Sequence, residues 1–173
     1  MSPKDIPFKL NRAQRRVLNK LEKLRKAGKP IKFILLKARQ WGGSTLVQIY
    51  MLWIMLVHRR NWNTVICGDV ETQSRNVRAM ITKALNKYPS YLLGETVKFT
   101  PFEGSSKNKV IQNTNCVVSI GSFQKPDTLR SGDISGAHLT EIGLWRATPG
   151  KKPEDLIQSI SGSIYDTAYT ILG

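Results

Sequence analysis

The sequence predicts an α/β domain in which helices flank a central, mostly parallel sheet. From residue 31 onward, short apolar runs that suit buried strands alternate with longer segments of helical periodicity. Glycine, proline and small polar residues separate these segments, and such alternation of strand and helix is typical of a parallel sheet. With 173 residues, of which 40% are hydrophobic, the chain fits a single domain with one core.

Local signals place each element of this fold. Asn11 suits a helix N-cap, and the helix that follows it is expected to end near Ala27 and Gly28. Three further helices are expected over 44–58, 71–87 and 153–160. Strands are expected over 31–36, 63–68, 109–112, 116–121, 134–140 and 166–172, with 109–112 and 116–121 forming a hairpin or a pair of short strands.

The chain is strongly basic, with a formal net charge of +15 and a pI of about 10.1. The first 40 residues hold 13 of the 27 Lys and Arg residues but only 2 of the 12 Asp and Glu residues. A charge of this size indicates a polyanionic partner such as nucleic acid, although a solvated helix face is the alternative interpretation. The longest apolar run, 46–57, is shorter than the roughly twenty residues of a membrane span, so it predicts a buried helix.

The cysteines and histidines predict no metal site. Cys67 and Cys116 each stand among β-branched residues and are expected to lie in buried strands. His58 and His138 are not grouped with them in the sequence.

Residues 37–45 (KARQWGGST) follow an apolar strand and open a helix, which is the setting of a phosphate-binding loop. A helix N-terminus offers unpaired N–H groups, and glycine lets phosphates approach the backbone. Against the pattern G-x-x-x-x-G-K-[ST], Gly42 and Ser44 match, whereas Lys37 replaces the first glycine and Gly43 replaces the lysine. The lysine therefore stands at the other end of the loop, from where its ammonium is expected to reach the phosphates. The alternative is an ordinary strand-to-helix turn.

This segment resembles the deviant Walker A motif of phage terminase large subunits, in which an Arg-Gln pair commonly precedes the final glycine. The resemblance implies a P-loop NTPase fold with ATP and Mg²⁺ as its nucleotide and metal. Ser44 is implied to help bind Mg²⁺, and Arg39 is implied to act both on the phosphates and in catalysis. The implied nucleotide-binding residues in this loop are Lys37, Arg39, Gln40, Gly42, Gly43, Ser44 and Thr45.

Residues 10–18 (LNRAQRRVL) resemble a short N-terminal segment of the same family that carries an adenine-reading glutamine. The resemblance implies that Gln14 reads the adenine edge. A solvent-facing helix residue is an equally good interpretation of Gln14 from the sequence alone.

Residues 134–145 (ISGAHLTEIGLW) resemble the Walker B region of terminases, an apolar strand that ends in two acids. The resemblance implies that Glu141 polarises the attacking water, and that Thr140 occupies the place of the metal-binding Asp. A threonine hydroxyl can accept a hydrogen bond from a Mg²⁺-bound water but supplies no charge, so Asp133 or Asp69 is expected to compensate if the fold brings either near. Glu141 is expected to end a strand that lies beside the strand preceding the phosphate loop; a surface carboxylate is the alternative.

Residues 122–133 resemble the loop before that strand in terminases, which often carries an Arg-Gly pair. Arg130 is the implied arginine that stabilises phosphate charge in the transition state, with a surface arginine as the alternative. Asp69, at the end of the 63–68 strand, is a further candidate at the sheet edge where ligands bind in open α/β folds.

The resemblance covers residues 10–172 and implies the ATPase motor domain of a terminase large subunit, which powers the packaging of double-stranded DNA into capsids. It implies a portal protein and a small terminase subunit as partners, a homo-oligomer during packaging, the host cytoplasm as location, and no membrane. The expected organisation is one ATPase domain over 1–173, with a basic helical segment over 1–30 and a P-loop core over 31–173. The family's C-terminal nuclease domain has no room here, so we expect a fragment, weakly active alone and monomeric. The alternatives are a non-catalytic nucleic-acid-binding module on a degenerate P-loop fold and a helicase-like translocase fragment.

Overall fold

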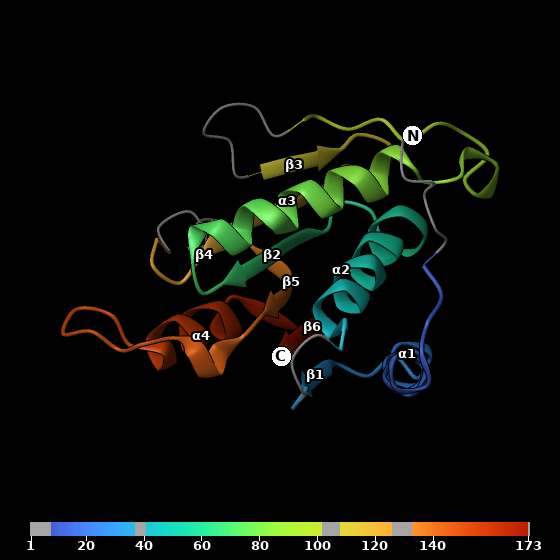
Figure 1. The fold of residues 1–173 in the computed structure, drawn as a ribbon. Coiled ribbons are helices and arrows are strands. Elements are labelled where there is room, and N and C mark those ends of the chain that lie inside the picture. Colours follow the sequence, from blue (N-terminus) through green and yellow to red (C-terminus); the bar gives the residue numbers. More distant parts are fainter. Residues whose placement is uncertain (1–7, 37–40, 102–107, 126–132, 173) are drawn as a thin grey trace.

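The computed structural model describes residues 8–36, 41–101, 108–125 and 133–172, and only the backbone of 165–172. It contains a six-stranded sheet between two layers of helices (Figure 1). The strand order is β1-β6-β5-β2-β4-β3, and every neighbouring pair is parallel except β3 with β4. The predicted α/β fold class is therefore confirmed. The strands are β1 Ile31–Ile34, β2 Asn63–Gly68, β3 Asn108–Ile111, β4 Cys116–Ser122, β5 Ile134–Leu139 and β6 Ile164–Leu172.

The helices begin and end close to the predicted positions. The long ones are α1 Arg12–Lys26, α2 Gly43–Trp53, α3 Glu71–Asn86 and α4 Pro153–Gly162. A π-helical turn, η1 Ile54–His58, extends α2, and two short 3₁₀ turns are η2 Ser90–Leu92 and η4 Ile142–Leu144. Within the described part of the chain, none of these helices is long and apolar enough to cross a membrane.

The N-terminus of α1 is fixed by a capping box, which confirms Asn11 as the N-cap. The Asn11 side chain accepts a hydrogen bond from the backbone N–H of Gln14 at 2.8 Å. The Gln14 side chain in turn accepts one from the backbone N–H of Asn11 at 2.9 Å. These two bonds satisfy N–H groups that a helix start otherwise leaves unpaired. At the other end, Gly28 has a positive φ of 64° just after the helix, which glycine adopts readily.

Two apolar clusters fill the space on the two sides of the sheet. Helices α1, α2 and α3 pack on one side, where Leu21, Met55 and Ile81 are fully buried. Helix α4 covers the other side, where Leu139 and Leu156 are buried (Figure 1). The predicted burial of both cysteines is also confirmed, because Cys67 and Cys116 are free thiols with no exposed surface.

The expectation that Glu141 ends a strand beside the loop-bearing strand is wrong. Strand β6 lies between β1 and β5, since Ile171 is in register with Phe33 of β1 on one side and His138 of β5 on the other. The chain leaves β5, crosses through α4 and returns as the next parallel strand, which is the usual outcome of such a crossover. Sequence order alone does not reveal on which side of β5 the returning strand pairs.

Candidate functional site

Three of the sequence-predicted segments meet at one edge of the sheet. The parallel strands β1, β2 and β5 all end there, so the N-terminus of α2, Asp69 after β2, and Thr140 with Glu141 after β5 share that edge. In open α/β sheets, this carboxyl edge is where ligands usually bind.

The N-terminus of α2 has the geometry of an anion-binding turn. Gly42 is its N-cap in the left-handed region, with φ 74° and ψ 21°, and no side chain of the described residues caps the helix start. A Cβ atom at Gly42 would lie 2.8 Å from the Gln14 side chain, so both conformation and space favour glycine. The free N–H groups around Gly43, Ser44 and Thr45 suit a phosphate.

Gln14 connects α1 to this turn. Its side-chain Nε2 donates to the backbone carbonyl oxygens of Gly42 at 3.2 Å and Trp41 at 3.4 Å. The residue is only 4% exposed, so the interpretation of Gln14 as a solvent-facing helix residue is wrong. Its assignment as the adenine reader stays a prediction.

The start of α2 and the end of β5 touch through two hydroxyl groups. Ser44 Oγ and Thr140 Oγ1 lie 3.0 Å apart, within hydrogen-bonding distance. The backbone N–H of Thr140 is held by the carbonyl of Cys67 at 2.9 Å, which extends the β2–β5 ladder by one bond. The two residues assigned to the metal are thus brought together, although 96 positions separate them in the sequence.

Gln73, in the first turn of α3, holds the side chain of Glu141. Gln73 Nε2 donates to Glu141 Oε2 at 2.5 Å, while Gln73 Oε1 accepts from the backbone N–H of Asp69 at 3.0 Å. Because a backbone N–H can only donate, the second bond fixes the amide orientation and turns its NH₂ group toward the carboxylate. Sequence reasoning missed Gln73; the signal available was a glutamine in the first turn of the helix that follows the neighbouring strand.

Glu141 itself has an unusual backbone. Its φ of 58° and ψ of 37° are left-handed, and it is the N-cap of η4. Such a conformation is uncommon for a residue other than glycine and costs of order 1–3 kcal/mol, and it is often found at functional sites. The side chain is partly buried and hydrogen-bonded, so the surface-carboxylate alternative is wrong.

Asp133 cannot compensate for the missing acid at position 140. Asp133 precedes β5 and Thr140 follows it, so a six-residue strand separates them by about 20 Å. Its backbone carbonyl instead accepts a bond from Asn63 at the start of β2, at the opposite edge of the sheet. The expectation for Asp133 is therefore wrong, whereas Asp69 does lie at the carboxyl edge.

The buried thiol of Cys67, close to Asp69, is unreactive. Burial raises the pKa of Cys67 to about 12, and the nearby Asp69 carboxylate contributes to the rise. A thiol with this pKa is protonated at neutral pH and is therefore a poor nucleophile.

Four assigned residues, Lys37, Arg39, Gln40 and Arg130, lie outside the described residues. Among the residues that are described, no group of three or more His, Cys, Asp and Glu side chains could hold a metal ion. Besides the carboxylates of Asp69 and Glu141, the side-chain oxygens beside the start of α2 are the Ser44 and Thr140 hydroxyls, which suit Mg²⁺ in type but carry no charge. Mg²⁺ keeps several waters and commonly shares a site with substrate phosphates, so this donor set fits a nucleotide-bound Mg²⁺ only.

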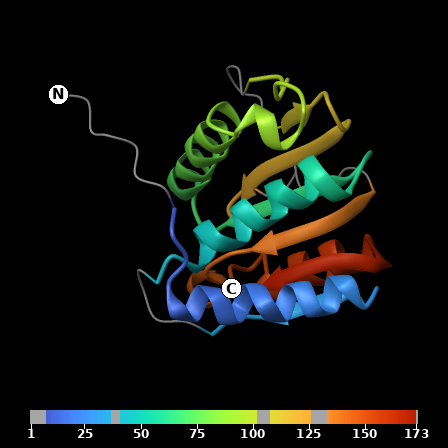
Figure 2. The ribbon, with the colours of Figure 1, turned by 90° about the vertical axis from the view of Figure 1, so that its right-hand side faces the viewer.

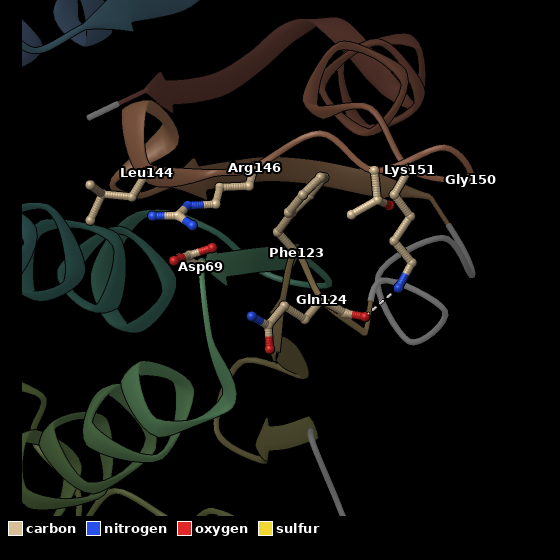
Figure 3. Close-up of a pocket in the computed structure, with 8 residues that line it drawn as sticks. Asp69, Phe123, Gln124, Leu144, Arg146, Gly150 and Lys151 are labelled. Atoms are coloured by element: carbon tan, nitrogen blue, oxygen red, sulfur yellow. Dashed lines mark hydrogen bonds between the residues drawn. The ribbon is translucent and has the colours of Figure 1, made fainter.

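A cleft of about 680 Å³ opens at the same edge, beyond the ends of β2, β4 and β5. Figure 3 shows the carboxylate of Asp69 and the guanidinium of Arg146 pointing toward each other across it. One wall is Phe123, whose ring stacks on Trp145 with centroids 4.9 Å apart. Among the described residues, Asp69 is the one sequence-predicted candidate in its lining, which includes Asp69, Phe123, Gln124, Leu144, Arg146, Thr148, Gly150 and Lys151.

No protein-family model matches the chain, and no curated protein matches it at the sequence level. Solved structures do resemble it. The large terminase of bacteriophage HK97 superimposes with a TM-score of 0.76 at 22% identity, over 99% of this chain and 34% of that one. The large terminase of a thermophilic bacteriophage, in complex with ADP, gives 0.66 at 14% identity, over 95% of this chain and 38% of that one.

The ATPase domain of the large terminase from Thermus phage P74-26 gives a TM-score of 0.62 at 14% identity, over 96% of this chain and 65% of that one. The chain thus spans about a third to two thirds of these proteins. Their shared architecture extends over nearly all of the present chain. The chain has the fold of the ATPase domain of phage large terminases.

Proposed function

We propose that this chain is the ATP-binding and ATP-hydrolysing motor domain of a phage terminase large subunit. The observation that carries the proposal is the convergence at one sheet edge of an uncapped helix N-terminus, the Ser44–Thr140 hydroxyl pair and the positioned carboxylate of Glu141. A phosphate site and a carboxylate that can act on water are the two parts that hydrolysis of a nucleotide requires. The terminase fold, and the ADP in complex with one of the terminases that share it, support the choice of ATP.

In this proposal the triphosphate lies on the N–H groups at the start of α2. Lys37 and Arg39 supply positive charge, Gln40 belongs to the same loop, and Gln14 reads the adenine. Gln14 lies beside the loop, where its Nε2 donates to the carbonyls of Trp41 and Gly42, and these bonds would be exchanged for bonds to the base when the nucleotide binds. The chain's own glycine at 42 keeps the backbone accessible there.

Mg²⁺, when bound with the nucleotide, would neutralise phosphate charge, and Ser44 and Thr140 are the residues that would hold it. Glu141 orients and polarises the attacking water through the carboxylate oxygen that Gln73 does not occupy. Arg130 stabilises charge that develops on the transferred phosphate. Gln73 is a positioning residue, since it touches Glu141 rather than the substrate.

The mechanical role is packaging of double-stranded DNA in the host cytoplasm, by a homo-oligomer that works with a portal protein and a small terminase subunit. Residues 1–173 form one ATPase domain, with the basic helical segment 1–30 joined to the P-loop core 31–173. Because neighbouring subunits complete such motors, we expect this chain alone to be monomeric and to hydrolyse ATP slowly.

A non-catalytic nucleic-acid-binding module is the second candidate. It is favoured by Thr140 in place of a metal-binding acid and by the net charge of +15. A helicase-like translocase is less well supported, because the lysine stands early in the loop and Thr-Glu replaces Asp-Glu. ATP binding and turnover separate both enzymatic functions from the module.

The direct test of the nucleotide site is calorimetric titration of the protein with ATP and Mg²⁺. Lys37→Ala should weaken ATP binding at least about tenfold, since it removes the main phosphate cation of the loop. Lys98→Ala, at an exposed position remote from the loop, is the matched control and should bind ATP as the wild type does. Equal ATP affinity in the wild type and Lys37→Ala would refute the proposal that Lys37 binds the phosphates from the start of the loop.

A further inference from the structure

The outer face of α1 carries a continuous row of cations. Six of them are exposed, and at about 100° per residue they fall on one side of the helix. We call this set the basic stripe; it consists of Arg12, Arg15, Arg16, Lys20, Lys23 and Lys26. Figure 2 shows α1 lying along one edge of the molecule. Because all six side chains are exposed, this side of the helix faces solvent.

The opposite side of α1 holds the helix firmly in place. Leu21 is completely buried in the core between helices and sheet. Glu22 accepts a hydrogen bond from the Tyr50 hydroxyl at 2.8 Å, and the Arg25 guanidinium lies over the Trp53 ring at 5.3 Å from its centroid. The helix is thus anchored to α2 before any partner arrives, and a pre-organised surface loses less entropy on binding.

Acidic side chains offset little of the charge of the basic stripe in the described structure, where Glu22 interacts electrostatically with Lys26 but forms its ion pair with Arg25. Glu22 is the one acid in α1, and it faces inward, where it is paired with Arg25 at 2.7 Å. Within the described residues, none of the six cations takes part in an ion pair. Their fields therefore add along the helix and attract anions.

We propose that the basic stripe binds the sugar–phosphate backbone of duplex DNA. The row runs from Arg12 to Lys26, about 21 Å at 1.5 Å per residue, which is too long for one small anion. Duplex DNA presents about one charge per 1.7 Å of axis, so a row of this length can contact several phosphates at once. The choice of DNA among polyanions rests on the proposed packaging function. The inference that this surface binds a polyanion rests only on the charges and exposure of the stripe.

The basic stripe lies on one side of α1, and the contact of α1 with the loop before α2 lies on the other side. Gln14, which bonds to the carbonyls of Trp41 and Gly42, is buried and is not part of the stripe. Substitutions in the stripe therefore leave the loop contacts intact, and DNA binding can be tested separately from ATP binding.

The test compares two fourfold variants that lose the same total charge. The stripe variant carries Arg12→Gln, Arg16→Gln, Lys20→Gln and Lys23→Gln; glutamine keeps the helix propensity of Arg and Lys. The control variant carries Arg75→Gln, Lys98→Gln, Lys125→Gln and Lys152→Gln, all at exposed positions outside α1.

Binding to a labelled DNA duplex is measured by fluorescence anisotropy without nucleotide, between about 50 and 200 mM salt. The stripe variant should bind at least about tenfold more weakly than the control variant. Its slope of log affinity against log salt should be shallower than that of the wild type by about 3 to 4, because four fewer phosphates are neutralised. The control variant should keep the wild-type slope within about one unit.

The proposal would be overturned by equal losses in the two variants, by wild-type affinity in the stripe variant, or by no binding of the wild type to duplex DNA at low salt. Stripe-dependent binding to an acidic protein or an anionic vesicle without binding to DNA would also overturn it. A parallel titration of the wild-type protein with ATP distinguishes the two proposals. If the wild type binds DNA through the stripe but does not bind ATP, the proposed function is wrong and the stripe proposal stands.

Discussion

Gln73 Nε2 donates a hydrogen bond to Glu141 Oε2 at 2.5 Å, and this bond joins the start of α3 to the end of β5. The same glutamine accepts a bond from the backbone N–H of Asp69 at 3.0 Å. Glu141, whose carboxylate orients the attacking water in the proposed mechanism, is therefore positioned by the first turn of the helix that follows β2. This relationship gives the first prediction.

Gln73→Ala should lower kcat for ATP about tenfold while leaving KM nearly unchanged, because the freed carboxylate samples orientations that do not face the water. Steady-state or single-turnover kinetics measure both constants. Gln158→Ala, at an exposed position of α4, is the matched control. A rise in KM with unchanged kcat would assign Gln73 to substrate binding and remove its positioning role.

The left-handed backbone of Glu141 predicts a difference in stability between two variants that both lack the carboxylate. Glu141→Gly should be more stable than Glu141→Ala by about 1 kcal/mol, because glycine adopts a φ of 58° without the Cβ penalty. Denaturant unfolding of the two variants measures this difference. Equal stability would mean that position 141 relaxes to an ordinary conformation.

Thr140 should limit the affinity for Mg²⁺. Thr140→Asp places a charged oxygen beside Ser44, so hydrolysis should reach half its maximum at a Mg²⁺ concentration at least several-fold lower than in the wild type. Thr140→Val removes the hydroxyl with little change in volume and should raise that concentration. Identical Mg²⁺ titrations for all three proteins would show that residue 140 does not contact the metal.

Glu22 gives a prediction about stability against pH. Its hydrogen bonds from Arg25, at 2.7 and 2.8 Å, lower the pKa of Glu22 below its ordinary value of 4.5, with a further contribution from the Tyr50 hydroxyl. A carboxyl whose pKa is lower in the folded state stabilises the fold above pH 4.5, and this contribution is lost as the pH falls through the folded pKa.

Glu22→Gln should therefore flatten the acid side of the stability profile, with the largest loss relative to the wild type at neutral pH. Thermal unfolding of both proteins from neutral pH to below about 4 measures it. Parallel profiles for the two proteins would mean that the contacts of Glu22 do not depend on its charge.

Signals confined to a few neighbouring residues predicted their structures well. Asn11 caps α1 as expected, and the hairpin of β3 and β4 lies within a residue of its predicted position. The phosphate-loop setting was also visible, because it depends on a strand, a glycine and a helix in succession. Such features need no knowledge of which strands are neighbours.

Features that depend on strand order were not predictable. The insertion of β6 between β1 and β5 follows from a crossover whose destination the sequence does not state. The contact of Gln73 with Glu141 spans 68 positions, and it exists only because β2 and β5 are paired in parallel. Asp133 was misjudged for the same reason, since proximity in sequence concealed its place at the far end of β5.

Glu141→Gln, measured in single turnover with protein in excess over ATP, tests the account most directly. The substitution keeps the size and polarity of the side chain but removes the carboxylate, so the hydrolysis rate should fall by roughly 100-fold or more while ATP affinity changes by no more than a few-fold. Glu95→Gln, at an exposed position, is the control and should hydrolyse ATP at the wild-type rate. Hydrolysis by Glu141→Gln at the wild-type rate would contradict the account and leave Glu141 as a structural residue at the end of β5.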